Sequence, residues 1–269
     1  MRRQSSLARF LASAAVTAIV AAGLGGCQTM ADVKGALTAK ADPALDADPR
    51  RAAEVYGERY RANPKDADAA LRYGQALRAT GQRAQAAAVL EQASIAHSTN
   101  KALLAAYGRA LADNGNFQQA FDVLGRAHSP DNPDWRIMSV QGTTLDQMGR
   151  HEEARRYYTG ALQMAPDEPS VLSNLGLSYV LSKDLPKAEE TLRRAQATGR
   201  ADARVRQNLA LAVGLQGRFA EAETIVKADL PADEAAANVA YLKQMLNRKE
   251  NPRAARNGKP PVVAFSPTD

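Results

Sequence analysis

Small and large apolar residues recur along the chain at a fixed interval of 34 positions. The first four intervals carry glycine or alanine at three places and a large apolar residue at a fourth, and the fifth interval keeps all but one of these small residues. The set comprises Gly74, Gly108, Gly142, Gly176 and Ala210; Ala86, Ala120, Ala154, Ala188 and Ala222; Ala93, Ala127, Ala161 and Ala195; and Leu90, Leu124, Tyr158, Leu192 and Val226. A fixed period of this length is typical of stacked helix pairs, in which small residues let two antiparallel helices approach closely.

The spacing predicts five helix-turn-helix units over residues 67–230, each with a glycine or alanine at the eighth position of its first helix. Glycines follow four of the five first helices, where a left-handed residue would end the helix at least cost. In the fourth unit Lys183 takes this place. Asp184 can then cap the next helix, and Pro186 fits the first turn of that helix.

These features predict an all-α fold, a tetratricopeptide-repeat solenoid of about five units, with both ends covered as stacked arrays require. An N-terminal half-repeat is expected over 50–66, where Ala52 and Tyr56 lie at the offsets of a second helix. Asp229 stands where the fifth unit should have alanine. A capping helix is expected over 231–247, with one apolar face formed by Ala235, Val239, Leu242 and Leu246.

The first 26 residues have the layout of an export signal. Residues 1–10 carry three arginines and no acidic residue, and residues 10–24 are mostly apolar but too few to span a membrane. The segment ends in Leu24-Gly25-Gly26-Cys27, which resembles the bacterial lipobox, whose cysteine is diacylated and becomes the new N-terminus. We therefore predict lipidation at Cys27. The alternative is an ordinary signal peptide with an incidental cysteine.

Two acyl chains anchor a protein firmly where one does not, so lipidation at Cys27 predicts a membrane-attached protein. In many bacteria with two membranes, a residue other than aspartate after the cysteine resembles a signal for the outer membrane, and this chain has Gln28. Residues 27–49 are expected to be a tether and residues 248–269 a tail. The predicted location is the outer membrane, with the repeats facing the periplasm.

The charge balance does not indicate a nucleic-acid partner. The formal net charge is +6, but three arginines lie in the predicted signal, which leaves 32 basic and 29 acidic residues and a net charge of +3. The single cysteine excludes an internal disulfide.

No catalytic, metal or cofactor motif stands out, and the sequence predicts a protein that is not an enzyme and has no small-molecule substrate. His97, His128 and His151 lie near helix ends in different units without metal-ligand spacing, so capping or surface placement is favoured. The adjacent carboxylates Glu152-Glu153 and Glu189-Glu190 do not face each other on a helix.

In tetratricopeptide arrays, which this chain resembles, first helices line a concave groove through repeat positions 2, 5, 9, 12 and 13. A groove that is charged at one end and apolar at the other suits an extended peptide or a helix, and salt would weaken binding that involves its arginines. The alternative is a face that is merely soluble. The predicted groove residues are Gln75, Arg78, Arg109, Asp113, Arg136, Thr143, Asp146, Gln147, Leu177 and Leu181.

Three stretches are more specific than the repeat period. They are the lipobox with Gln28-Thr29, the segment 169–179 that reads PSVLSNLGLSY, and the segment 229–246 that reads DLPADEAAANVAYLKQML. Together they resemble the TadD-type lipoproteins of the tight-adherence, or Flp pilus, assembly system, from the signal to about Leu246. The resemblance implies a non-enzymatic outer-membrane protein that helps the secretin channel to localise or assemble.

The partners implied are therefore the secretin or other assembly lipoproteins of a pilus secretion system. Two alternatives remain at this stage. One is a repeat lipoprotein of another envelope system, such as a type IV pilus pilotin or a polysaccharide-export adaptor. The other is a targeting subunit for a periplasmic enzyme.

Overall fold

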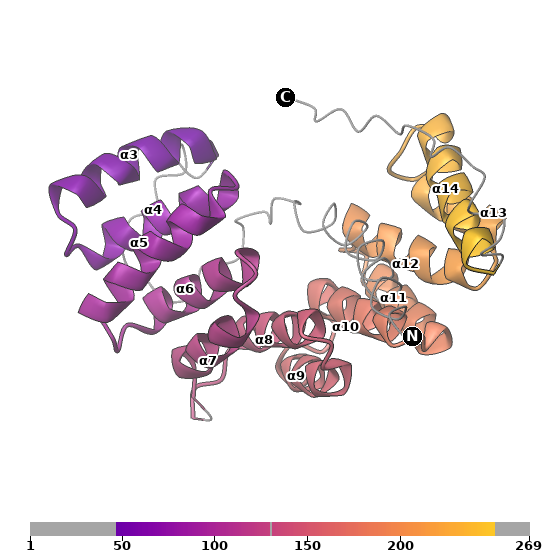
Figure 1. Ribbon diagram of the computed structural model, residues 1–269. Coiled ribbons are helices and arrows are strands. Elements are labelled where there is room, and N and C mark those ends of the chain that lie inside the picture. The colour runs from indigo at the N-terminus through magenta and orange to yellow at the C-terminus, as the bar shows by residue number, and fades with distance from the viewer. Residues whose placement is uncertain (1–46, 130, 251–269) are drawn as a thin grey trace, which may run out of the picture.

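The computed structural model describes residues 47–129 and 131–250, which form helices stacked in sequence into an open arc, with α8 and α10 on its inner side and α7 and α9 on its outer side (Figure 1). The helices are α3 (Pro49–Ala62), α4 (Ala67–Ala79), α5 (Arg83–Ala96), α6 (Lys101–Asp113), α7 (Phe117–Ala127), α8 (Trp135–Gln147), α9 (His151–Met164), α10 (Pro169–Leu181), α11 (Leu185–Ala197), α12 (Ala203–Leu215), α13 (Phe219–Val226) and α14 (Ala232–Glu250).

The helices follow the 34-residue period. The five first helices begin at Ala67, Lys101, Trp135, Pro169 and Ala203, at 34-residue intervals. Each first helix packs on its own second helix and on the next first helix, so that α4, α6, α8, α10 and α12 form a continuous row. The predicted all-α repeat solenoid is confirmed.

Within each unit, the eighth residue of the first helix sits directly under a large side chain of the second. A Cβ added at Gly108 would lie 2.5 Å from Leu124 Cγ, and one added at Gly142 would lie 2.5 Å from Tyr158 Cε1. Ordinary carbon–carbon contacts are about 3.5–4.0 Å, so the helix pairs of the first four units require glycine at the eighth position of the first helix. The sequence-based explanation of the small residues is therefore correct at these positions.

The turn of the fourth unit forms without glycine. Lys183 adopts a φ of 66°, while Gly149 and Gly217 at the matching turns have φ of 76° and 84°. Asp184 then caps α11 by accepting a hydrogen bond from the Lys187 backbone N–H, and Pro186 occupies the first turn. Lys183 thus adopts the left-handed conformation. For a residue with a Cβ, this conformation costs roughly 1–2 kcal/mol.

Both ends of the array are covered by extra helices. At the N-terminal end α3 packs on α4 and buries Ala52 and Tyr56. At the other end α14 packs on α12 and α13, with Ala235 and Val239 buried and Leu242 seated against Gly214.

Two details at the C-terminal end go beyond the sequence pattern. Helix α14 continues to Glu250, past the predicted end at 247, because the next helix-breaking residue is Pro252. Asp229, which replaces the expected alanine, accepts a hydrogen bond of 2.7 Å from Arg206 Nε on α12. The fifth unit thus closes through an ion pair where the other units use a small apolar contact.

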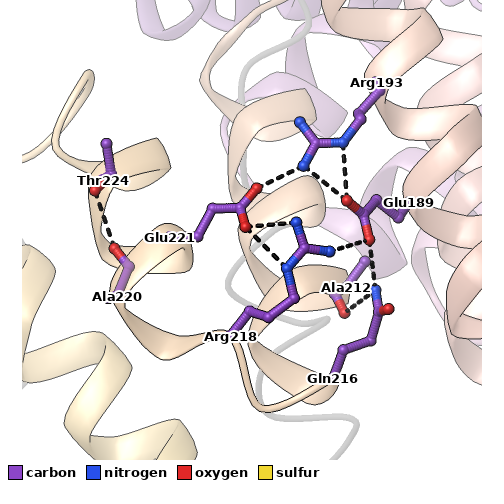
Figure 2. Close-up of polar contacts among 8 residues, drawn as sticks. All are labelled: Glu189, Arg193, Ala212, Gln216, Arg218, Ala220, Glu221 and Thr224. Atoms are coloured by element: carbon purple, nitrogen blue, oxygen red, sulfur yellow. Dashed lines mark hydrogen bonds and ion pairs between the residues drawn. The ribbon is translucent and has the colours of Figure 1, made fainter.

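A cluster of charged groups joins the fourth unit to the fifth (Figure 2). Glu189 on α11 lies 2.7 Å from Arg193 and 2.7 Å from Arg218, and it accepts a hydrogen bond of 2.8 Å from Gln216. Arg193 in turn lies 2.6 Å from Glu221 on α13. Burial alone would raise the pKa of Glu189, but hydrogen bonds from Arg218, Gln216 and Arg193 outweigh it and lower the pKa to about 2.

The predicted signal peptide, Cys27, and nearly all of the predicted tether and tail lie outside the described residues. Within 47–129 and 131–250, no helix combines the length and the apolar character that crossing a membrane requires.

Replacing Lys183 by glycine is expected to stabilise the protein. Glycine adopts a φ of 66° without a Cβ penalty, and its greater freedom in the unfolded chain offsets only part of the gain. We expect the free energy of unfolding to rise by about 0.5–1 kcal/mol, measured by urea denaturation. The matched control Lys227→Gly, at a φ of −61°, should destabilise the protein. Destabilisation by Lys183→Gly would contradict this account of the turn.

The Glu189 cluster makes the junction of the last two units sensitive to acid. Because the pKa of Glu189 is about 2 in the folded protein against an ordinary 4.5, the stabilisation is complete above pH 4.5 and is lost as the pH falls towards 2. Its arginine partners are solvent-exposed, so we expect Glu189→Gln to lower the free energy of unfolding at pH 7 by only about 1 kcal/mol.

This prediction is measured by urea denaturation between pH 7 and pH 2. Glu189→Gln should flatten the pH dependence in the acid range. The neighbouring exposed residue supplies the control, since Glu190→Gln should leave both the stability and the pH profile close to wild type. Equal effects of the two variants would show that the cluster does not couple the units.

Candidate partner-binding face

One stripe of each first helix stays accessible to solvent while the rest is covered by its neighbours. The stripe contains repeat positions 2, 9 and 13, which are half-buried or exposed in all five units. These positions are 7 and 4 residues apart and so share one face of a helix. We call the surface formed by the five stripes the inner face. Its position-9 residues are Gln75, Arg109, Thr143, Leu177 and Leu211, and its position-13 residues are Ala79, Asp113, Gln147, Leu181 and Leu215.

The inner face changes character along the array. In the first three units positions 9 and 13 are polar, apart from Ala79, and in the last two units all four residues are leucine. The charged end also contains Arg78, at position 12 of α4, and Arg136, at position 2 of α8. Arg136 stacks on Trp135 with its guanidinium carbon 4.4 Å from the ring centroid.

Arg109 is the central cation of the charged end. It lies on α6, between α4 and α8, and it is half-buried. Burial lowers the pKa of its guanidinium to about 10, the positive charges of Arg78 and Arg136 act in the same direction, and the carboxylates of Asp134 and Asp113 offset only part of this. The side chain therefore remains protonated at neutral pH but sits in an environment that disfavours its charge.

The acidic residues of this end are already engaged. Asp113 Oδ2 accepts a hydrogen bond of 2.6 Å from Arg78 Nε, which links α4 to α6. Asp134 caps α8 by accepting from the backbone N–H groups of Arg136 and Ile137. Among the described residues, Arg109 makes no hydrogen bond through its side chain and no ion pair.

Asp146 was expected in the groove, and the structure places it inside the protein instead. Its side chain is only 6% exposed. Oδ1 accepts hydrogen bonds of 2.8 Å from Ser178 and lies 2.8 Å from His151 Nδ1, while Oδ2 accepts one of 2.9 Å from Tyr158. The carboxylate thus joins α8, α9 and α10. Burial raises the pKa of Asp146, and the hydrogen bonds offset only part of that rise.

This cluster contains aspartate, histidine and serine but is not arranged as a catalytic triad. In a triad the serine hydroxyl donates to the imidazole, which the aspartate orients. Here the Ser178 hydroxyl donates to Asp146, and Ser178 is fully buried. The arrangement satisfies buried polar groups between two units.

Position 5, also expected in the groove, is buried in the first four units, as with Leu71 and Ser173. The buried serines instead join neighbouring first helices. Asn174 donates to Ser139 at 3.1 Å, and Asn208 donates to Ser173 at 3.0 Å. The asparagines occupy repeat position 6, next to the predicted position 5. The donor and acceptor of each contact lie 35 residues apart in the sequence, but sequence reasoning missed this contact.

The other predicted groove residues lie on or beside the stripe. Asp113 is exposed on it, and Arg78 is half-buried beside it. Seven are half-buried on the stripe itself: Gln75, Arg109, Arg136, Thr143, Gln147, Leu177 and Leu181. The structure thus brings together Arg78, Arg109, Asp113 and Arg136 at one end. It places Leu177 and Leu181 at the other, beside Leu211 and Leu215.

The histidines hold neighbouring segments together. His97 Nε2 lies 2.8 Å from the Lys65 carbonyl oxygen, and His128 Nε2 lies 2.9 Å from Gln141 Oε1 in the next unit. In the part of the chain that the structure describes, no group of three or more His, Cys, Asp or Glu residues could hold a metal ion.

Two pockets, of about 430 Å³ and 370 Å³, lie away from the inner face. The first is lined mainly by α9 with Tyr179, and the second by residues around the ends of α5 and α7. Neither is lined by any of the ten predicted groove residues, so a ligand of the inner face would contact an extended surface.

The fold, the 34-residue spacing and the exposed inner stripe define a tetratricopeptide-repeat array. A sequence profile described as "Tetratricopeptide repeat" matches residues 147–212, and a profile described as "Anaphase-promoting complex, cyclosome, subunit 3" matches residues 50–127. No curated protein matches the chain.

Solved structures of repeat proteins resemble it in fold. PilW, described as a widely conserved type IV pilus biogenesis factor, is 18% identical with a TM-score of 0.64, over 72% of this chain and 91% of PilW. A chain of the APC/C hetero-tetramer Cut9–Hcn1 is 16% identical with a TM-score of 0.63, over 78% of this chain but only 42% of that one. A TPR protein of Thermus thermophilus is 21% identical with a TM-score of 0.58, over 66% of this chain and 99% of that protein. At such low identities, these TM-scores show a shared fold and nothing further.

The interior placement of Asp146 is tested by truncating its side chain. Asp146→Ala leaves the buried hydroxyls of Tyr158 and Ser178 without their acceptor, so the free energy of unfolding should fall by about 2–3 kcal/mol in urea denaturation. The adjacent stripe residue is the control, because Gln147→Ala should change stability by less than about 0.5 kcal/mol. Equal stability of the two variants would contradict the interior role.

Proposed function

We propose that this protein is a non-enzymatic, lipid-anchored scaffold of the outer membrane that helps to assemble the tight-adherence (Flp) pilus secretion machinery. It faces the periplasm and holds a segment of the secretin, or of another assembly lipoprotein, on its inner face. The protein aids the localisation or assembly of the secretin by keeping that segment at the membrane.

The observation that carries the proposal is the division of the inner face into a charged end and a leucine end. Stacked repeats create extended concave surfaces that bind other proteins. A surface with cations at one end and half-buried leucines at the other distinguishes between partner segments through both charge and apolar contact.

The pilus assignment rests on the resemblance of the signal and of the segments 169–179 and 229–246 to the TadD-type lipoproteins. The similarity of fold to PilW, a type IV pilus biogenesis factor, is compatible with this role. Lipidation at Cys27 and the tether that follows it would place the array close to the membrane while leaving its inner face free.

A scaffold role also agrees with the chemistry of the interior. The one cluster that combines Asp146, His151 and Ser178 is committed to hydrogen bonds between units. Two other functions would use the same fold: a repeat lipoprotein of another envelope system, such as a type IV pilus pilotin or a polysaccharide-export adaptor, and a targeting subunit for a periplasmic enzyme.

The proposal is tested by crosslinked pull-down from native membranes together with membrane fractionation. The wild-type protein should fractionate with the outer membrane and recover a secretin and its pilus neighbours. Cys27→Ser should lose both the fractionation and piliation, because the acyl chains supply the anchor.

Gln28→Asp serves as the matched control, since it keeps the lipidated cysteine and changes only the residue that directs sorting. It should keep the protein membrane-bound but move it from the outer membrane. Recovery of polysaccharide-export or cell-wall proteins in place of a secretin would reject the pilus assignment.

A further inference from the structure

The charged end of the inner face holds a cation that lacks an anion. Arg109 is half-buried on the central first helix of this end, and Arg78 and Arg136 lie on the helices to either side. Of the two nearby carboxylates, Asp113 is bound to Arg78 and Asp134 caps α8. The local charge is therefore positive. Among the described residues the guanidinium of Arg109 makes no ion pair, although Asp134 and Asp113 favour its charge at longer range.

This arrangement is unfavourable for the isolated protein. A partly desolvated guanidinium beside two like charges loses hydration without gaining an ion pair, as its lowered pKa of about 10 reflects. An incoming carboxylate would remove this penalty, and the planar guanidinium can donate two parallel hydrogen bonds to it. The chemistry of Arg109 thus favours an anion with two acceptor oxygens, and in a protein partner a carboxylate supplies them.

The opposite end of the inner face presents apolar side chains. Leu177 and Leu181 lie one turn apart on α10, and Leu211 and Leu215 lie one turn apart on α12, at the same two repeat positions. We call these four residues the leucine patch. Leu177, Leu211 and Leu215 rest on the buried core of the last two units while remaining partly exposed, so the patch has a fixed base and an open surface.

From these two features we propose that the inner face binds an extended peptide segment of a partner protein, with an acidic side chain on Arg109 and an apolar side chain on the leucine patch. The inference rests on the proposed function only in taking the inner face as the binding surface. It adds the chemical character of the bound segment and the order of its features along the array.

The repeat geometry also sets the spacing of those features. From α6, which carries Arg109, to α10, which carries the start of the leucine patch, there are two steps between adjacent first helices, each of about 8–10 Å. An extended chain advances roughly 3.3 Å per residue. The acidic and apolar residues of the ligand should therefore be separated by about five or six positions, with the intervening residues crossing α8 near the neutral side chains of Thr143 and Gln147.

The test uses the full-length chain in detergent micelles and a fluorescent synthetic peptide in binding titrations. The peptide carries one glutamate, about five serine or threonine residues and a leucine–phenylalanine pair. Two further peptides replace the glutamate by glutamine or shorten the spacer to one residue. We expect each change to weaken binding about tenfold. Added salt should weaken the binding of the original peptide, which contains glutamate, but not that of the glutamine peptide.

Protein variants identify the contacts. Arg109→Gln should abolish the preference for the glutamate peptide over the glutamine peptide. Leu211→Ser should weaken the binding of both of these peptides. Matched controls lie on second helices away from the inner face. Arg156→Gln replaces an exposed arginine of α9 and Ile95→Ser replaces an exposed apolar residue of α5, and both should bind like wild type.

The unfolding temperature separates binding from structure. Because Arg109 makes no ion pair with the residues that the structure describes, Arg109→Gln should keep or raise that temperature while it weakens binding. Loss of stability in this variant, or equal binding of the glutamate and glutamine peptides, would overturn the proposal.

A further outcome concerns the chain's own tail, which contains the apolar segment 260–265 and ends in Asp269. A double variant, Val262→Asp with Val263→Asp, tests this outcome. If the peptide binds only to that variant, the tail occupies the inner face, and the proposal of a partner segment there is rejected. If no peptide binds but the pull-down recovers pilus proteins, the peptide inference is rejected and the proposed function stands. Glutamate-dependent binding without pilus proteins would reject the pilus assignment alone.

Discussion

The close contact between repeat positions 8 and 24 is the constraint on which the whole array depends. A second helix can approach its first helix only where the backbone at position 8 carries little or no side chain, as at Gly176 beneath Leu192. In the fifth unit an alanine, Ala210, is paired with the smaller Val226, so an added methyl on one helix is matched by a lost carbon on the other.

Because that contact holds each unit together, the junctions between units are free to differ. Units three and four meet around a buried carboxylate with three polar partners, and units four and five meet around an exposed cluster of arginines and glutamates. The inner stripe varies even more, from Gln75 at one end to Leu215 at the other, without disturbing the pairs beneath it. Such separation lets one backbone framework present a directional binding surface.

The period of the chain was enough to predict the fold, the starts of the helices, the left-handed turn at Lys183 and both end helices. It was not enough to place every polar side chain. Position 12 is half-buried at Arg78, yet at Asp146 it turns inward. The signal was Tyr158, which stands where other units have leucine or valine and brings a hydroxyl that needs a buried partner. The missing partner of Arg109 also depends on contacts between helices, which a period does not report.

The covered C-terminal end of the solenoid has a consequence for how copies of the chain can associate. A repeat array with bare ends presents complementary surfaces at its two ends, and surfaces of that kind can add head to tail into an open filament. Here Leu242 fills the space over Gly214, and α3 covers the first unit at the opposite end. A second copy that continued the same packing would therefore meet α14 or α3 in place of a bare repeat unit. Within the described residues, the chain itself supplies the helices that end the stack at both sides.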